Sequence, residues 1–145
     1  MDVKGAGVKQ RGFTLIEVMI VVGIIGIGVI LAIPMYLDYI VRARVVEGLS
    51  LASVAQLAVA ERSGENNLLP LTQQATGYVS PSSTANVVSI TIANNGSAEI
   101  TITYTLRAGG GTIILKPVLQ ATHSIIWTCT DGTLENKYRP ATCRS

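Results

Sequence analysis

Residues 17–38 read EVMIVVGIIGIGVILAIPMYLD, and this stretch decides the fold. Between its two carboxylates, Glu17 and Asp38, lie 20 consecutive uncharged residues, most of them aliphatic. A bilayer core is about 30 Å thick, and a helix that rises 1.5 Å per residue crosses it in about 20 residues. The run is therefore long enough to span a membrane as a single helix.

The residues before this run predict its orientation. The first 12, MDVKGAGVKQRG, carry three basic side chains against one acidic one. By the positive-inside rule this flank holds the N-terminus in the cytoplasm and leaves the bulk of the chain outside. An ordinary secretory signal is the alternative, with Gly26-Ile27-Gly28 as its cleavage site. Because the apolar run continues well past that site, we interpret it as a retained membrane anchor.

The carboxylate at the start of the run is the most informative residue. A charge inside hydrocarbon costs about 2.5–3.5 kcal/mol on insertion scales, so Glu17 either lies among the headgroups or meets a partner. It closes the string Arg11-Gly12-Phe13-Thr14-Leu15-Ile16-Glu17. In this string a basic residue and a glycine precede an aromatic residue, and the carboxylate follows four positions later.

Residues 9–45, which contain this string and Pro34, resemble the N-terminus of type IV pilins of the short-leader (type IVa) class. The resemblance implies that a prepilin peptidase cuts between Gly12 and Phe13 and that the new amino group of Phe13 is N-methylated. The apolar helix then stays on the mature protein. The segments implied are a cleaved leader (1–12), a hydrophobic transmembrane and assembly helix (13–37) and a globular head (38–145).

The same resemblance gives Glu17 a role in assembly. Residues four apart lie on one face of a helix, so Glu17 can neutralise the amine of Phe13 in its own subunit or in a neighbour. In the family the partner is the neighbour. The resemblance also implies that the helix loosens in the filament from about Gly26 to Pro34. The simpler alternative is that membrane helices tolerate these residues and that small residues let helices approach closely.

Beyond Pro34 the apolar pattern becomes amphipathic. Apolar residues recur three or four positions apart, which predicts one long helix from about Thr14 to Arg62 that ends at Ser63-Gly64. Val54 and Leu57 fall outside this stripe, so we expect the helix to be covered on more than one side. The stripe consists of Val41, Val45, Leu49, Ala52, Ala55 and Val59.

The C-terminal half predicts strands after a connecting loop at residues 65–84. Asn95-Gly96-Ser97 formally fits a glycosylation acceptor, but a tight turn explains it without a sugar. Short turns here and at Gly109-Gly110-Gly111 imply an antiparallel sheet, whose apolar face the helical stripe can cover. The sequence therefore predicts an α+β fold, a long N-terminal helix packed on a four-stranded antiparallel sheet, as in pilins. The expected strands are residues 88–92, 100–106, 112–119 and 124–129.

Cys129 and Cys143 are the only cysteines. Export would place them in an oxidising compartment, where a disulfide is expected, whereas zinc would need more ligands than the single His123 supplies. The pilin resemblance implies the same bond, closing a C-terminal loop (129–143). In some relatives this loop contacts receptors, and in others a C-terminal serine carries a glycan, which makes Ser145 a candidate glycosylation site. Loop residues considered for surface contact are Asp131, Glu135, Lys137, Tyr138 and Arg139, although a solvated loop is the simpler interpretation.

These patterns favour a structural protein over an enzyme. The resemblance implies a major pilin that enters the inner membrane as a prepilin and is built by the pilus assembly machinery into a homopolymer on the cell surface. Adhesion to a host or surface receptor, twitching motility and DNA uptake are the functions it implies. A minor pilin or a type II secretion pseudopilin is the alternative. No nucleophile–base pair, paired acids or phosphate loop is visible, so we expect no catalysis, cofactor or metal.

The composition fits this interpretation. Charged residues make up 14% of the 145 residues, against roughly 25% in soluble domains. The formal charge of +2 belongs to the leader, because removing it takes three of the 11 basic residues and one of the nine acidic ones and leaves eight of each. Without a sequence cluster of Lys or Arg beyond the leader, or an aromatic platform, direct nucleic-acid binding is not supported.

Overall fold

A computed structural model describes residues 12–122 and 124–145. His123 and the expected leader before Gly12 lie outside the described residues. The chain divides into two compact units, Met1–Tyr36 and Leu37–Ser145. Among the described residues, the first unit consists mainly of a helix without a core of its own, and the second is a folded head.

Helix α1 (Leu15–Asn66) begins in the first unit and ends in the second. Pro34 lies inside it without ending it. The prediction that the helix stops at Ser63-Gly64 is wrong. The helix continues to Asn66, and Asn67 then takes a left-handed backbone conformation with φ 54° and donates its N–H to the carbonyl of Ser63 at 2.8 Å. Asparagine adopts this conformation more readily than most residues, so Asn67 was the better stop signal.

In the second unit, the predicted stripe of α1 forms one side of the core. Val45, Ala52, Ala55 and Val59 are fully buried, and Leu49 packs against them. The two apolar residues outside the stripe, Val54 and Leu57, are exposed on the other side of the helix. The predicted stripe is therefore confirmed from Val45 to Val59, whereas Val41 is half-buried and lies outside the core. Cover on a second side of the helix stays a prediction for the assembled filament.

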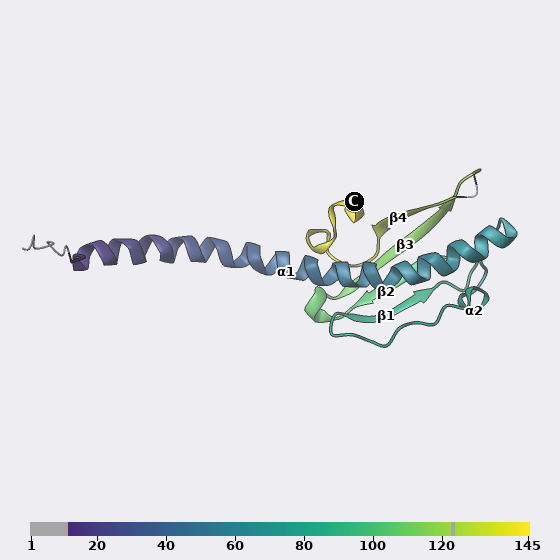
Figure 1. Cartoon of the computed structure of the whole chain (residues 1–145), viewed down its shortest axis with the longest axis horizontal. Helices are drawn as coiled ribbons and strands as arrows, with labels where there is room; N and C mark the ends of the chain where they lie inside the picture. Colours follow the sequence, from purple (N-terminus) through teal and green to yellow (C-terminus); the bar gives the residue numbers. More distant parts are fainter. Residues whose placement is uncertain (1–11, 123) are drawn as a thin grey trace, which may run out of the picture. The chain divides into compact units, whose positions relative to one another are not determined.

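The predicted four-stranded antiparallel sheet is also confirmed, with strand order β1-β2-β3-β4. Figure 1 shows the second half of α1 lying along one face of this sheet. The sheet contributes fully buried isoleucines at positions 90, 100, 102 and 113, and Ile90 and Ile113 both pair with Ile102 in the ladder. The strands are β1 (Val87–Ile92), β2 (Ile100–Tyr104), β3 (Gly111–Leu119) and β4 (Ile125–Asp131).

One close contact fixes how the helix packs on the sheet. The hydroxyl of Tyr104 donates to the carbonyl of Val45 at 2.9 Å, inside the core. Gly48 lies one turn further along, where an added Cβ would be 2.5 Å from the Tyr104 ring. Glycine is therefore required at position 48 for the aromatic ring to lie against the helix backbone. Burial raises the pKa of Tyr104.

Two local predictions are wrong. The expected strand over residues 100–106 ends at Tyr104, and Leu106–Ala108 forms a 3-10 turn, η1, that leaves the side chain of Leu106 92% exposed. The connecting loop contains a short helix, α2 (Gln73–Thr76), in which Thr72 accepts a hydrogen bond from the N–H of Ala75. The expected strand included Leu106, but the chain must turn before this residue to begin β3.

Candidate assembly site and disulfide loop

The residues expected to act in processing and assembly lie at the start of α1. Phe13 is 78% exposed and Glu17, in the first helical turn, is also exposed. The hydroxyl of Thr14 donates to the Glu17 carboxylate at 3.4 Å, and the Thr14 carbonyl accepts from the N–H of Glu17 at 3.1 Å. A carboxylate here is also stabilised by the positive end of the helix dipole.

Sequence reasoning missed the role of Thr14. The spacing Thr14-x-x-Glu17 before an apolar run is that of a capping box and points to Thr14 from the sequence alone. In the structure the Thr14 hydroxyl bonds the Glu17 side chain, and the Glu17 N–H bonds the Thr14 carbonyl, so the capping-box pair itself is not formed. The Thr14 hydroxyl therefore helps to orient the carboxylate of Glu17, which we expect to pair with an amine in assembly.

The described part of the first unit is apolar on all sides and exposed on all sides. Every residue from Gly12 to Tyr36 is exposed. An added Cβ at Gly23, Gly26 or Gly28 would have no neighbour within 4 Å, so the backbone is open to close approach there. Within the described residues, α1 is the one helix long and apolar enough to cross a membrane. A helix that is hydrophobic all round needs lipid or other helices to cover it.

The two cysteines form the expected disulfide. Cys129 on β4 and Cys143 in a short 3-10 turn are joined with their Cα atoms 4.7 Å apart. The side chain of Cys143 is buried, and Cys129 packs against the core. The bond therefore ties the C-terminus of the chain to the edge strand of the sheet.

Arg139 organises this loop from inside. We considered it for surface contact, but it is only 4% exposed, so that expectation is wrong. Its guanidinium donates to the carbonyls of Leu134 and Gly132, both at 2.8 Å, and to that of Thr130. The loop thus closes around a buried cation that satisfies its inward-facing carbonyls. No sequence motif marks this role, because the acceptors are backbone atoms.

The other side chains considered in the loop are exposed or half-buried. Lys137 Nζ lies 2.9 Å from the Glu135 carboxylate and 4.6 Å from the centre of the Tyr138 ring. The hydrogen bond with Glu135 raises the pKa of Lys137. Ser145 is exposed, and its hydroxyl accepts a hydrogen bond from the side-chain amide of Asn136 at 3.0 Å.

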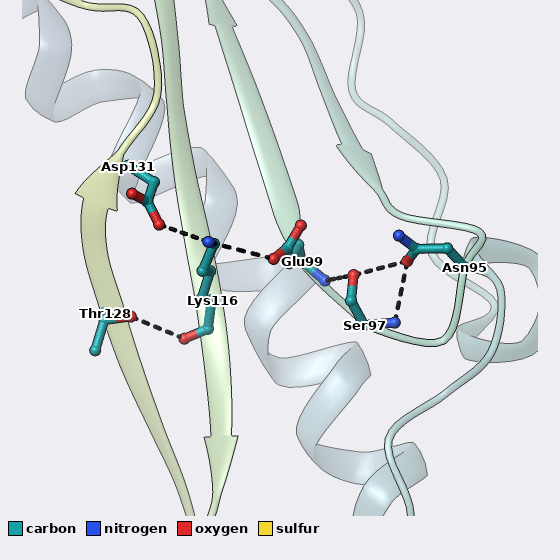
Figure 2. Close-up of polar contacts among 6 residues, drawn as sticks. All are labelled: Asn95, Ser97, Glu99, Lys116, Thr128 and Asp131. Atoms are coloured by element: carbon teal, nitrogen blue, oxygen red, sulfur yellow. Dashed lines mark hydrogen bonds and ion pairs between the residues drawn. The ribbon is translucent and has the colours of Figure 1, made fainter.

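A cluster of ionic side chains crosses three strands at the exposed face of the sheet (Figure 2). Lys116 on β3 lies between Asp131 on β4, 2.7 Å away, and Glu99 just before β2, 3.7 Å away. The hydrogen bond with Asp131 raises the pKa of Lys116, so its amine stays protonated and is a poor nucleophile. Exposed pairs of this kind contribute little stability and hold side chains in register.

The turn drawn beside this cluster explains the formal glycosylation triplet. The side-chain oxygen of Asn95 accepts from the N–H and the hydroxyl of Ser97, at 3.1 and 2.7 Å (Figure 2). Gly96 has φ 82°, a conformation that glycine adopts without strain. The turn interpretation of these three residues is confirmed. Among the described residues, no group of three or more His, Cys, Asp or Glu side chains could hold a metal.

Both units of the chain are similar to known proteins. A family model described as Pilin (bacterial filament) matches residues 41–144, and a model of the prokaryotic N-terminal methylation motif matches residues 8–33. Fimbrial protein EcpC of Eikenella corrodens is 33% identical over 144 residues, covering 94% of this chain and 92% of EcpC.

Two further relatives are similar along most of their length. Type IV major fimbrial protein FimA of Dichelobacter nodosus (strain VCS1703A) is 31% identical over 139 residues, covering 87% of this chain and 85% of FimA. Type IV major pilin protein PilE1 of Neisseria gonorrhoeae is 30% identical over 155 residues, covering 93% and 94%. The matched methylation motif contains the Phe13–Glu17 site, and the matched pilin region contains the disulfide loop.

Proposed function

The chain belongs to the pilin family of bacterial filament proteins, and from this membership we propose that it is the structural subunit of a type IV pilus. One observation carries the proposal. From Leu15 to Tyr36 the helix is exposed on all sides although most of its side chains are apolar. Such a helix gains stability only by entering lipid or by packing among copies of itself, and a pilin does each in turn.

The first step is processing at the N-terminus. We propose that a prepilin peptidase cleaves between Gly12 and Phe13 and that the new amino group of Phe13 is methylated. The match of residues 8–33 to the methylation motif supports this step, as does the exposure of Gly12 and Phe13. The basic leader is thereby removed while the apolar helix stays on the subunit.

The second step is recognition between subunits. Glu17 lies in the first turn of α1, where its carboxylate would be costly in an apolar setting without a partner. The amine of Phe13 from a neighbouring subunit supplies the opposite charge. Pairing of the two groups then favours one axial stagger of the helices over others.

The third step concerns the middle of the helix. In the subunit α1 is continuous through Gly26 and Pro34. We propose that it opens between these residues on assembly, because Pro34 supplies no N–H to the helical ladder and three glycines nearby reduce helix propensity. A loosened segment would let the filament extend and bend.

The setting follows from the same proposal. The subunit is held in the inner membrane by residues 13–37, passes to the pilus assembly machinery and ends as a homopolymer on the cell surface. Adhesion, twitching motility and DNA uptake are the activities we assign to that filament. The exposed side of the disulfide loop is our candidate for receptor contact, and Ser145 remains a candidate glycosylation site. The relatives named above are major subunits or fimbrial proteins, which does not favour a minor pilin or a pseudopilin.

Mass spectrometry of sheared filaments tests the proposal directly. In cells that express this chain as their only major pilin, the filament protein should begin at Phe13 and be one methyl group heavier than the unmodified sequence. It should also dominate the sheared fraction. A filament protein that begins at Met1, or a sheared fraction without this chain, would contradict the proposal.

A further inference from the structure

Two arginines on α1 hold two separate loops of the head against the same part of the helix. Arg44 Nη1 donates to the carbonyl of Arg107 in η1 at 2.8 Å. Arg42 Nε donates to the carbonyl of Lys137 in the disulfide loop at 2.6 Å. Each of the two carbonyls belongs to a residue with a cationic side chain. We call the four residues Arg42, Arg44, Arg107 and Lys137 the basic collar.

The turn that carries Arg107 is fixed on several sides. Gly109, with φ 94°, approaches Tyr138 so closely that an added Cβ would be 2.8 Å from the ring. An added Cβ on Gly111 would be 2.9 Å from the backbone nitrogen of Leu134, and that N–H donates to the carbonyl of Thr112 at 3.0 Å. The turn η1 therefore packs tightly against the disulfide loop, so its conformation is fixed before any partner binds.

This preformed turn exposes a large apolar side chain. Leu106 is 92% exposed, more than any other large hydrophobic side chain in the described chain. Its neighbour Arg107 is exposed as well, and among the described residues its side chain has no ion pair. An apolar tip beside cationic side chains is the pattern of surfaces that insert shallowly into anionic lipid interfaces.

Along α1, Arg42 lies at the outer edge of a headgroup layer and Arg44 just beyond it. The uncharged run ends at Leu37, and Arg42 and Arg44 follow five and seven residues later. At 1.5 Å per residue they lie roughly 7–10 Å further along the helix axis. The headgroup region of one leaflet is roughly 5–8 Å thick. Tyr39, an aromatic residue of the type enriched at membrane interfaces, lies at this level and is exposed.

The nearby carboxylates offset part of the charge of the basic collar. Glu135 pairs with Lys137. Glu47 accepts hydrogen bonds from Asn86 and Thr84, which lower its pKa and turn it toward the loop before β1. Asp38 lies one helical turn before Arg42. Glu47 and Asp38 stay ionised, so the four basic side chains of the collar against these three carboxylates leave a net formal charge of +1. Arg107 is the basic side chain nearest Leu106 in sequence.

We propose that the basic collar and Leu106 form a docking surface for the anionic headgroups of the membrane that holds the subunit before assembly. The inference rests on the proposed membrane stage of the subunit. In this state Leu106 enters the interface and Arg107 and Arg44 meet lipid phosphates. The head is thereby held down on the bilayer until extraction into the filament removes these contacts.

Hydrogen exchange of the full processed chain in lipid nanodiscs tests the proposal. We compare discs of phosphatidylcholine with discs that also contain phosphatidylglycerol, and follow the amides of residues 105–111. The anionic lipid should slow their exchange, and Arg107→Gln should reduce that protection about fivefold, because one basic residue near an anionic surface contributes about that factor. Leu106→Ser should reduce it as well, and raising the salt concentration should weaken it in the unchanged chain.

Matched variants separate a lipid contact from other effects. Arg62→Gln and Leu71→Ser make the same changes at exposed positions outside the collar and should leave the protection unchanged. Equal exchange in both kinds of disc, or protection that Arg107→Gln leaves unchanged, overturns the proposal. Protection that needs several subunits per disc also overturns it, because the partner would then be a second copy. Extraction of the chain from discs by carbonate would instead contradict the membrane stage itself.

Discussion

The two units of this chain use apolar residues in opposite ways. In the head, isoleucines such as Ile102 are fully buried between the helix and the sheet. In the N-terminal unit, isoleucines such as Ile24 are 66% exposed, and no described side chain between Gly12 and Tyr36 is buried. The head therefore completes its own hydrophobic burial within one chain. The apolar side chains of the N-terminal helix are buried only when lipid, and later other subunits, cover them.

The largest expected effect comes from the one carboxylate at the start of that exposed helix. Glu17→Val should abolish filaments, because the stagger between subunits loses its charge pair, while membrane insertion and leader cleavage continue. The measurement is electron microscopy of the sheared fraction together with mass spectrometry of the membrane fraction. The matched control is Glu61→Val, which removes an exposed carboxylate from the head portion of the same helix.

This first prediction has a clear contrary result. Normal filaments made only of the Glu17→Val subunit would show that the carboxylate has no role in assembly. Loss of cleavage at Gly12–Phe13 would show instead that the variant acts on processing. The two outcomes are distinguished by the N-terminus of the protein left in the membrane.

A matched pair of isoleucine truncations tests the comparison between the units most directly. Ile102→Ala should destabilise the head by about 3–4 kcal/mol, because it leaves a cavity in the core. Ile24→Ala should leave head unfolding unchanged and affect assembly alone, since its side chain contacts solvent or lipid. Urea unfolding of the full chain in detergent micelles, followed by the fluorescence of the single Trp127, measures both. Equal destabilisation by the two variants would refute the separation.

The outlines of both units could be predicted from the sequence, the first from the length of its uncharged apolar run and the second from periodicity. Period 3.6 in the stripe identified the buried side of α1, and alternation identified the strands. Leu106 was misplaced because alternation cannot show where a strand must end to turn back. Asn67 was overlooked as a helix stop in favour of Gly64, although both residue types permit the left-handed conformation. These errors lie at element ends, where the backbone conformation of one residue decides.

The candidate sites divide along the same line. Glu17 and the cysteines stand in recognisable spacings, so they could be found without a structure. Arg139 could not, because its partners are three carbonyls that only the folded loop brings together. The basic collar was also invisible, because Arg42, Arg107 and Lys137 come from three distant parts of the sequence. A sequence motif reveals residues that act together when they are close in the sequence. Arg139 with its carbonyl partners, and the basic collar, form only when the fold brings distant residues together.

Arg139 gives the third prediction, within the head. Arg139→Leu should destabilise the head by about 2 kcal/mol, because the carbonyls of Leu134, Gly132 and Thr130 lose their donors in a buried site. The same micelle unfolding measures it, and Arg62→Leu, an exposed arginine on α1 whose pair with Glu65 is also exposed, is the control. If Arg139→Leu behaves like the control, the cation does not organise the loop.

The smallest effect concerns the tyrosine that joins helix and sheet. Tyr104→Phe removes the hydroxyl that donates to Val45, so it should cost about 1 kcal/mol at neutral pH. The folded pKa of Tyr104 is raised from 10.0 by burial, which means that the unfolded chain releases this proton first as the pH rises. The contribution of neutral Tyr104 is therefore complete below pH 10 and is lost progressively above it.

Urea unfolding of the head, measured from pH 8 to pH 11, tests whether the contribution of Tyr104 to stability falls as the pH rises. The head with Tyr104 should lose stability above pH 10 more steeply than Tyr104→Phe, so the difference between the two should shrink as the pH rises. Tyr36→Phe, in the exposed part of α1, should leave the pH profile of head unfolding unchanged. Parallel profiles for Tyr104 and Tyr104→Phe would mean that the hydroxyl meets solvent. A change of profile with Tyr36→Phe would mean that the two units do not bury their side chains independently.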